Sequence, residues 1–311
     1  MIEVQDLTKK YGELTAVRGL SFKVDKGKIW GLLGPNAAGK TTTMRVLTGY
    51  LPATDGKATV AGFDVFEQPN EVKKVIGYLP EVVPLYPEMT VAGYLEFVAE
   101  IKQVPAAKRK AAVDRVLKLA ALGDVKGRLI KNISRGFKQR VGIAQAMIHD
   151  PRVLILDEPT IGLDPAQIKE IRELIKSLRG EHTIMLSTHI LPEVTQVCDG
   201  AVIINEGRLM ASGSLAELTA TLQERDKKGG AVLKIRRDAA EAARAFLEIP
   251  GVESAVAEAG EIRLEWSRGR DLREEVAALA VGRRLGLLEM RPTALSMEEL
   301  YMKIVSGGLG Q

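Results

Sequence analysis

Residues 28–41 read Lys-Ile-Trp-Gly-Leu-Leu-Gly-Pro-Asn-Ala-Ala-Gly-Lys-Thr. A short apolar run leads into the pattern G-x-x-x-x-G-K-[ST], and a run with helical periodicity follows it. Glycines let the backbone curl so that successive N–H groups point at one phosphate, and the N-terminus of the helix adds about half a positive charge. The alternative, an ordinary glycine-containing turn, fits this context less well. The sequence therefore predicts a strand, a phosphate-binding loop and a helix.

The loop also predicts which side chains meet the ligand. Lys40 would neutralise the β- and γ-phosphates of a nucleotide, and the Thr41 hydroxyl would bind Mg²⁺. The predicted nucleotide contacts are the loop and the residue after it: Gly34, Pro35, Asn36, Ala37, Ala38, Gly39, Lys40, Thr41 and Thr42.

A second apolar run, Val153–Leu156, delivers two acids, Asp157 and Glu158. Such a strand is buried and projects its last residues at the edge of the sheet where α/β folds bind ligands. Asp157 would hold Mg²⁺ through its water shell, and Glu158 could polarise the water that attacks the γ-phosphate. Taken alone, the pattern also suits a strand whose final acid caps the next helix. The upstream loop favours the catalytic interpretation.

The composition limits the classes of function. The chain has 311 residues, 46% of them apolar, and 44 basic against 40 acidic residues give a net charge of +4. That excess is too small and dispersed to indicate nucleic-acid binding, so no nucleic-acid partner is expected. The single cysteine, Cys198, excludes an internal disulfide and is expected to be a small buried residue. No window holds the roughly 18 uninterrupted apolar residues of a membrane span, so any transport channel must be another chain.

The first two-thirds of the chain predicts an α/β core. Nearly continuous Val, Ile and Leu runs are typical of parallel strands covered on both faces. Between about residues 85 and 150, helical patterns follow one another without a strong strand, which predicts an inserted helical lobe. The expected strands are 28–33, 75–79, 153–157, 183–187 and 201–205, and the expected helices are 39–48, 90–103, 106–120, 137–149 and 165–179.

The last third predicts a separate small domain. The charged, glycine-ended stretch 223–230 is the best candidate for a linker between a domain at 1–222 and an accessory domain at 231–311. The accessory domain has the order β-α-β-β-α-β, which is the ferredoxin-like α+β arrangement. Ser296-Met297-Glu298-Glu299 has the form of a capping box that opens a final helix.

Five further motifs accompany the phosphate loop. Tyr11, Ser134-Arg135-Gly136-Phe137-Lys138-Gln139, Asp157-Glu158-Pro159, Gly162-Leu163-Asp164-Pro165 and Ser187-Thr188-His189 occur in this order along the chain. With the loop, they resemble the ATP-binding-cassette (ABC) ATPases over about residues 1–220. The resemblance implies a P-loop NTPase core with a parallel sheet and an inserted helical subdomain, which binds and hydrolyses ATP with Mg²⁺.

The resemblance also implies roles for single residues. Tyr11 would stack on adenine, although a half-exposed aromatic at the end of a strand is the alternative. Ser134 and Gly136 would reach the γ-phosphate held by a second ABC subunit, so hydrolysis requires a dimer, for which a homodimer is expected. Asp164 would lie in the loop that crosses the dimer boundary. His189 would contact the γ-phosphate and hold the attacking water, which makes Glu158, His189 and Lys40 the expected catalytic residues.

The chain departs from the family pattern in three places: at Ala37, at Glu81, and in the signature, where Arg135 and Phe137 stand in place of glycine and glutamine. Ala37 stands where glycine is common and costs on the order of 1 kcal/mol if its φ is positive. Glu81 stands where glutamine is usual; it could approach Mg²⁺ or its waters, and a protonated or lysine-paired state would relieve its repulsion of phosphate. Arg135 replaces a glycine and could either contact phosphate in a bidentate manner or extend into solvent.

The Ser-Arg-Gly-Phe-Lys-Gln and Tyr-Leu-Pro-Glu forms resemble the drug-efflux, sodium-efflux and gliding-motility exporters. The expected protein is therefore the ATP-hydrolysing subunit of an exporter, attached to the cytoplasmic face of the membrane through a separate transmembrane permease. Two alternatives remain at this stage. One is a soluble cassette ATPase that acts on DNA or ribosomes, and the other is a nucleotide sensor that does not hydrolyse ATP.

Overall fold

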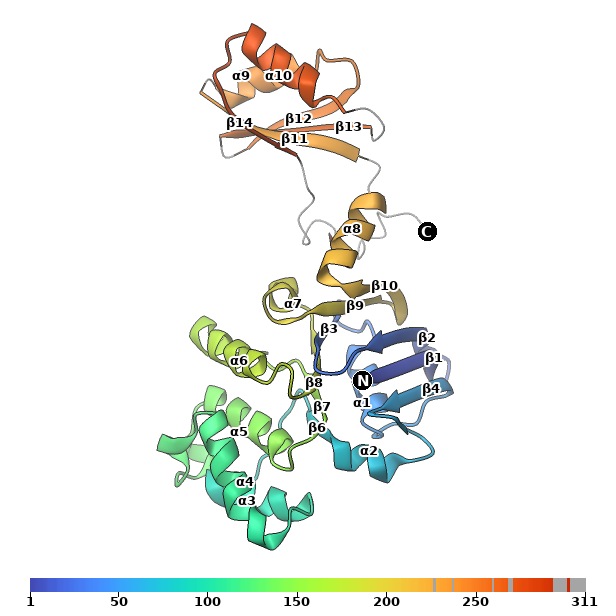
Figure 1. Ribbon diagram of the computed structural model, residues 1–311, viewed down its shortest axis with the longest axis vertical. Coiled ribbons are helices and arrows are strands. Elements are labelled where there is room, and N and C mark those ends of the chain that lie inside the picture. The colour runs from blue at the N-terminus through green and yellow to red at the C-terminus, as the bar shows by residue number, and fades with distance from the viewer. Residues whose placement is uncertain (226–227, 237, 259, 268–270, 293–300, 303–311) are drawn as a thin grey trace. The chain divides into compact units, whose positions relative to one another are not determined.

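The computed structural model describes residues 1–225, 228–236, 238–258, 260–267, 271–292 and 301–302. The chain forms two compact units, Met1–Leu218 and Thr219–Gln311. Each unit has its own β-structure and its own buried core (Figure 1).

A six-stranded sheet of order β10-β9-β3-β8-β7-β6 forms the centre of the first unit. Its strands from β9 to β6 run parallel, and β10 pairs with β9 in the antiparallel sense. The parallel α/β core expected from the apolar runs is confirmed. The strands are β3 (Ile29–Leu33), β6 (Ile76–Leu79), β7 (Val153–Asp157), β8 (Thr183–Thr188), β9 (Gly200–Asn205) and β10 (Arg208–Ser214).

A second, antiparallel sheet of order β2-β1-β4-β5 was not expected from the sequence. Its strands alternate buried and exposed residues, with Ile2 and Val4 buried on β1 and Phe22 and Val24 buried on β2. One buried apolar cluster joins Leu20 of this sheet to residues of helix α1 and of the parallel sheet, so α1 packs against both sheets. The elements are β1 (Ile2–Tyr11), β2 (Leu14–Val24), β4 (Asp55–Val60), β5 (Phe63–Asp64) and α1 (Lys40–Leu47).

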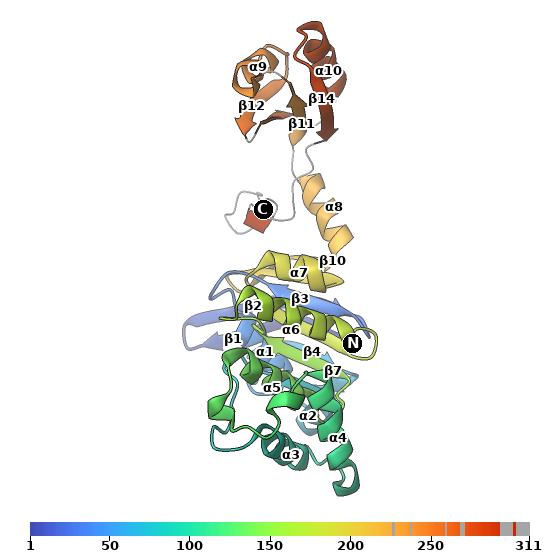
Figure 2. The same ribbon diagram turned by 90° about the vertical axis from the view of Figure 1, so that its left-hand side faces the viewer.

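Three helices, α3, α4 and α5, gather in one lobe (Figures 1 and 2). Helix α5 begins two residues earlier than expected because Ser134 caps it, its Oγ accepting a hydrogen bond of 3.4 Å from the Phe137 amide. The helices of this unit after α1 are α2 (Pro69–Val75), α3 (Val91–Ile101), α4 (Ala106–Leu119), α5 (Arg135–Met147), α6 (Pro165–Ser177) and α7 (Leu191–Val197), with 3₁₀ turns at Gly123–Val125 and Ile130–Asn132. Helix α8 (Leu215–Arg225) begins in this unit and continues into the second.

The second unit has the expected β-α-β-β-α-β order. Its antiparallel sheet has the order β12-β13-β11-β14, and Phe246, Leu233 and Trp266 lie in its core. Figure 1 shows α9 and α10 on one face of this sheet. The elements are β11 (Lys228–Ile235), α9 (Ala239–Phe246), β12 (Val252–Glu258), β13 (Glu261–Ser267), α10 (Arg273–Gly282) and β14 (Leu287–Pro292).

The stretch 223–230 differs from the expected linker. Helix α8 continues to Arg225, and β11 begins at Lys228. Gly229 lies in this strand, and packing explains why the residue is glycine. A Cβ there would lie 2.4 Å from Nε1 of Trp266, which leaves no room for a side chain. The capping box predicted at Ser296–Glu299 lies outside the described residues.

Candidate nucleotide-binding site

The order of the parallel strands brings four sequence-distant segments to one edge of the sheet. In the register, Leu33 pairs with Thr188, Asp157 pairs with Ser187 and Leu79 pairs with Leu156. The residues that follow β3, β8, β7 and β6 therefore lie in neighbouring positions. These are the phosphate loop, His189, Glu158 and the segment that contains Glu81.

The phosphate loop has the tight backbone that its glycines suggested. A Cβ at Gly34 would lie 2.4 Å from the carbonyl oxygen of Ile204, and Gly39 has a φ of +100°. Both positions therefore require glycine. Ala37 has a φ of 64°, so the positive φ considered for this residue is present. Its Cβ makes this left-handed backbone conformation energetically unfavourable.

Lys40 is the first residue of α1 and has a buried side chain. Its ammonium group donates to the carbonyl oxygens of Gly34 and Pro35 at 2.8 and 3.1 Å. It also lies 3.3 Å from Oε1 of Glu158. The loop thus curls around its own lysine and places one positive charge at the centre of the site.

Asp157 ends β7 in a buried position. Its Oδ1 accepts from the hydroxyls of Ser187 at 2.6 Å and Thr41 at 3.4 Å. Its Oδ2 is buried without a hydrogen-bond partner. Burial raises the pKa of this carboxyl above its ordinary value, the two hydroxyls oppose the shift, and the charges of Glu81 and Glu158 add to it.

The donor set around Asp157 suits Mg²⁺. This ion prefers oxygen ligands and is commonly held by one or two carboxylates together with substrate phosphates. The unpartnered Oδ2 and the nearby Thr41 hydroxyl supply such oxygens. Among the described residues, no group of three or more His, Cys, Asp or Glu side chains could hold a metal ion unaided. The residues therefore fit a magnesium ion that is shared with a phosphate.

Glu158 lies between Lys40 and His189. Its Oε2 is 3.1 Å from Nδ1 of His189, and its backbone amide donates to the Ser187 hydroxyl at 2.9 Å. Glu158 has a φ of 47°, and residues other than glycine, Asn and Asp rarely adopt a positive φ. The strand end, the Ser187 hydroxyl, the Lys40 ammonium group and the His189 ring together hold Glu158 in the site.

A cavity of about 670 Å³ opens in front of these groups. Tyr11, which is 44% exposed, lines it, and its stacking on a base stays a prediction. Three further residues, Leu14, Ala16 and Ile161, were not predicted. Tyr11 and Leu14 flank the tight turn between β1 and β2, and this turn is the sequence signal that could have revealed Leu14. The lining residues are Tyr11, Leu14, Ala16, Asn36, Ala37, Gly39, Lys40, Thr41, Thr42, Glu81, Glu158, Ile161 and His189.

Other predicted contacts lie outside this cavity. Four of the predicted residues belong to the loop or to the strand end beside it but do not line the cavity: Gly34, Pro35, Ala38 and Asp157. Ser134 and Gly136 open α5 in the helical lobe. The structure therefore does not bring these two residues to their own chain's phosphate loop.

Glu81 and Arg135 depart from the family pattern in different ways. Glu81 lines the cavity, is exposed, and forms no ion pair with a described lysine. Arg135 is also exposed. However, its guanidinium donates to the carbonyl oxygen of Ile161 at 3.1 Å, so it is held against its own chain instead of extending into solvent.

The chain was compared with known proteins. Residues 17–161 match the family model described as "ABC transporter". The bacitracin transport ATP-binding protein BcrA of Bacillus licheniformis is 43% identical over 212 residues, which cover 68% of each protein. The linearmycin resistance ATP-binding protein LnrL of Bacillus subtilis is 34% identical over 223 residues, 71% of this chain and 72% of that protein.

The chain belongs to the ATP-binding proteins of ABC transporters.

The solved structures agree with this assignment. A structure described as the ATP-binding subunit of an ABC transporter superposes on the cassette with a TM-score of 0.65 and 30% identity, over 71% of this chain and 92% of the other. The cassette is thus an ATP-binding and ATP-hydrolysing subunit, and the family and branch inferred from its motifs are confirmed. None of its described helices is long and apolar enough to span a membrane.

Proposed function

We propose that the cavity binds Mg²⁺-ATP and that Lys40, Glu158 and His189 act directly on the γ-phosphate and its attacking water. The observation that supports this assignment is the position of Glu158 within 3.3 Å of Lys40 and 3.1 Å of His189. Glu158 polarises the water, His189 orients it, and Lys40 stabilises the charge on the phosphate. Catalysis of phosphoryl transfer is mostly such positioning and charge stabilisation.

Mg²⁺ would be held by Thr41 and, through its water shell, by Asp157, with Glu81 close to the same shell. When bound, the ion would neutralise charge on the phosphates. The raised pKa of Asp157 reflects burial of a carboxylate, and a cation beside it would favour its ionised form. Tyr11 stacks on the base, and the backbone N–H groups of residues 36–42 enclose the phosphates.

A second copy of the chain completes each site. Ser134 and Gly136 lie at the N-terminus of α5, away from the phosphate loop of their own chain. A helix N-terminus favours anions, so this turn is suited to the γ-phosphate of another subunit. We therefore propose a head-to-tail homodimer that closes on two ATP molecules.

The substitution Glu158→Gln tests these roles. The amide keeps the shape of the side chain but cannot act as a base, so ATP should accumulate in a closed dimer while hydrolysis falls by about 10²–10⁴-fold. Sedimentation with and without ATP, together with phosphate release, measures both effects. Glu181→Gln, which changes an exposed glutamate outside the site, is the matched control and should behave as wild type.

Equal hydrolysis by wild-type protein and Glu158→Gln would disprove the base assignment. A wild-type protein that binds ATP without turnover would favour the sensor alternative. The soluble DNA- or ribosome-directed alternative is less well supported, because the relatives named above are transport and resistance proteins.

We further propose that the subunit drives export through a separate permease at the cytoplasmic face of the membrane. The helical lobe carries exposed apolar side chains at Val82, Tyr86 and Ile101. Tyr86 packs edge-on against Phe97 with ring centroids 5.5 Å apart. Exposed aromatic and aliphatic groups are typical of protein interaction sites, and we call Val82, Tyr86, Phe97 and Ile101 the apolar strip.

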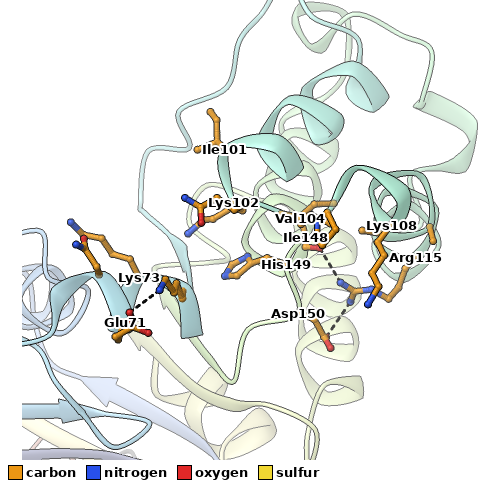
Figure 3. Close-up of a pocket in the computed structure, with 16 residues that line it drawn as sticks. Glu71, Lys73, Ile101, Lys102, Val104, Lys108, Arg115, Ile148, His149 and Asp150 are labelled. Carbon is orange, nitrogen blue, oxygen red and sulfur yellow. Dashed lines mark hydrogen bonds and ion pairs between the residues drawn. The ribbon is translucent and has the colours of Figure 1, made fainter.

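A pocket of about 1160 Å³ adjoins this strip and contains Ile101. Figure 3 shows Lys73, Lys102 and His149 around the same space. Burial, and then the charge of Lys73, lowers the pKa of Lys102. The lining of the pocket has more basic than acidic side chains: Lys73, Lys74, Lys102, Lys108 and Arg115 against Glu71 and Asp150. An acidic cytoplasmic segment of the permease would complement this pocket.

Site-specific crosslinking tests the permease contact. Cys198 is buried, so a cysteine introduced by Ile101→Cys can be labelled selectively with a photo-crosslinker in cell membranes. We expect an adduct with a membrane-spanning protein, whereas Val256→Cys on the C-terminal unit, also exposed, should give no such adduct. Identical adduct patterns at both positions would contradict the proposed docking face.

A further inference from the structure

Arg135 lies flat on the backbone of Gly162. An ideal Cβ at Gly162 would be 2.4 Å from both Cζ and Nη2 of Arg135 and 2.6 Å from Nη1. Since three of the four heavy atoms of the guanidinium group are this close, the glycine provides the surface against which the arginine packs. The hydrogen bond from Nη2 to the Ile161 carbonyl, 3.1 Å long, fixes the group in that place.

A second contact joins the same two segments. A Cβ at Gly136 would lie 2.6 Å from Cδ of Gln167, so the glutamine side chain covers this glycine. Gln167 in turn donates its backbone amide to Oδ1 of Asp164 at 2.9 Å. The first turn of α5 and the segment 161–167 therefore cover each other's glycines.

The other side of this segment is tied to the catalytic groups through Glu193. Glu193 is buried, and its Oε1 accepts a short hydrogen bond from the Thr160 hydroxyl. Its Oε2 accepts from Thr188 at 2.6 Å. Thr188 directly precedes His189, which contacts Glu158. The loop 160–164 is thus attached at one end to α5 and at the other to the residues around the γ-phosphate.

We propose that Arg135 and Glu193 are positioning residues that link the two sites of the dimer. The inference rests on the proposed function, in which Ser134 and Gly136 contact the partner's nucleotide. Through the contacts of Arg135 and Gln167, a displacement of that turn would move the loop 160–164. Through the hydrogen bonds of Glu193, a displacement of the loop would move Thr188 and His189. ATP held by the α5 turn of one subunit thereby sets the geometry of that subunit's own catalytic groups.

The test compares steady-state ATP hydrolysis by the wild type, Arg135→Ala, Gly162→Ala and the double variant. A coupling of the usual size predicts a fall in kcat of about tenfold for each single variant. We expect KM to stay within about twofold, because the phosphate loop is unchanged, and the Hill coefficient for ATP to fall towards 1. Both substitutions remove the same contact, so the double variant should be no slower than the slower single variant.

Two controls separate this effect from general damage. Gly180→Ala introduces a methyl group at a φ of +87° with no atom within 4 Å of its Cβ, which reproduces the backbone strain of Gly162→Ala without displacing an arginine. Arg128→Ala removes another exposed arginine of the helical lobe. Both controls should retain the wild-type kcat and Hill coefficient.

Thr160→Val tests the Glu193 end of the link, and it should lower kcat and the Hill coefficient as Arg135→Ala does. Wild-type kinetics in Arg135→Ala, or multiplicative losses in the double variant, would overturn the inference. A wild-type protein that neither hydrolyses ATP nor dimerises would instead refute the proposed function on which it rests.

Discussion

The ammonium group of Lys40 and the carboxylate of Glu158 form a buried ion pair with 3.3 Å between Nζ and Oε1, their side chains being 6% and 8% exposed. Two loop carbonyls accept the remaining hydrogen bonds of the lysine. A nucleotide phosphate that binds Lys40 must therefore compete with Glu158. We therefore expect Glu158, the proposed catalytic carboxylate, also to influence the affinity for nucleotide.

ADP binding tests this competition without forming the closed dimer, because ADP has no γ-phosphate for a second subunit to grip. We expect Glu158→Gln to bind ADP a few-fold more tightly than wild type, since breaking a neutral contact costs less than breaking a buried ion pair. Lys40→Ala should weaken ADP binding by at least about tenfold, the loss of one charge-assisted hydrogen bond. Calorimetry measures both constants. Weaker binding by Glu158→Gln would contradict the competition.

Removal of the Tyr11 ring should weaken nucleotide binding. Stacking of a base on an aromatic side chain contributes about 1–3 kcal/mol, so Tyr11→Ala should raise the Kd for ATP by about five- to a hundredfold, while Tyr11→Phe retains most of the affinity. The matched control is Tyr50→Ala, which removes an exposed tyrosine that does not line the cavity. Fluorescent-nucleotide titration compares the three variants. Equal losses in Tyr11→Ala and Tyr50→Ala would exclude the stacking role.

The sequence predicted the part of the fold that depends on local patterns. The runs at Ile29–Leu33 and 153–156 are apolar because both faces of those strands are buried. Such runs can be recognised in the sequence without knowledge of distant contacts. The sheet containing β1 and β2 was missed, because register shifts interrupt its alternation between Val4 and Leu7 and again beyond it.

Tertiary contacts account for the other differences. Gly229 resembled a linker residue because the ring of Trp266, which excludes a side chain there, is distant in sequence. The interaction of Arg135 with Ile161 joins residues 26 positions apart, and no local pattern encodes it. The convergence of Lys40, Asp157 and Glu158 was predictable because the phosphate loop and the acid-ended strand form one recognisable combination.

The protein should lose stability as the pH falls below neutrality, partly through His149. Burial lowers the pKa of His149 to about 4, and a ring nitrogen lies 3.1 Å from the carbonyl oxygen of Ile76. Between pH 6.5 and 4 the unfolded chain binds a proton at this position that the folded chain does not, so the stabilisation present at higher pH is lost across this window.

The variant His149→Gln isolates this contribution, because its amide does not titrate. Urea unfolding at pH 7 and pH 5 should show that the wild type loses about 1–3 kcal/mol more than the variant. The difference between the two proteins matters here, since Asp157, whose pKa is raised, contributes a pH dependence of the opposite sign. Equal pH dependence in the two proteins would show that His149 is not buried in the neutral form.

The C-terminal unit should depend strongly on Phe246. This side chain is fully buried in the core of the unit, whereas the next residue, Leu247, is 50% exposed. Phe246→Ala should destabilise the unit by about 3–5 kcal/mol, while Leu247→Ala should change its stability by less than about 0.5 kcal/mol. Hydrogen exchange in β11, β12 and β13 measures the difference. Comparable exchange in both variants would contradict the packing of this core.

One hydroxyl serves both acids at the end of β7. Ser187 donates to the Asp157 side chain and accepts from the Glu158 backbone amide, which fixes its proton on the side of Asp157. The residue expected to hold the metal shell and the residue expected to act on water therefore have a common anchor. A substitution of Ser187 would therefore remove a hydrogen-bond donor from Asp157 and the acceptor of the Glu158 amide in a single step.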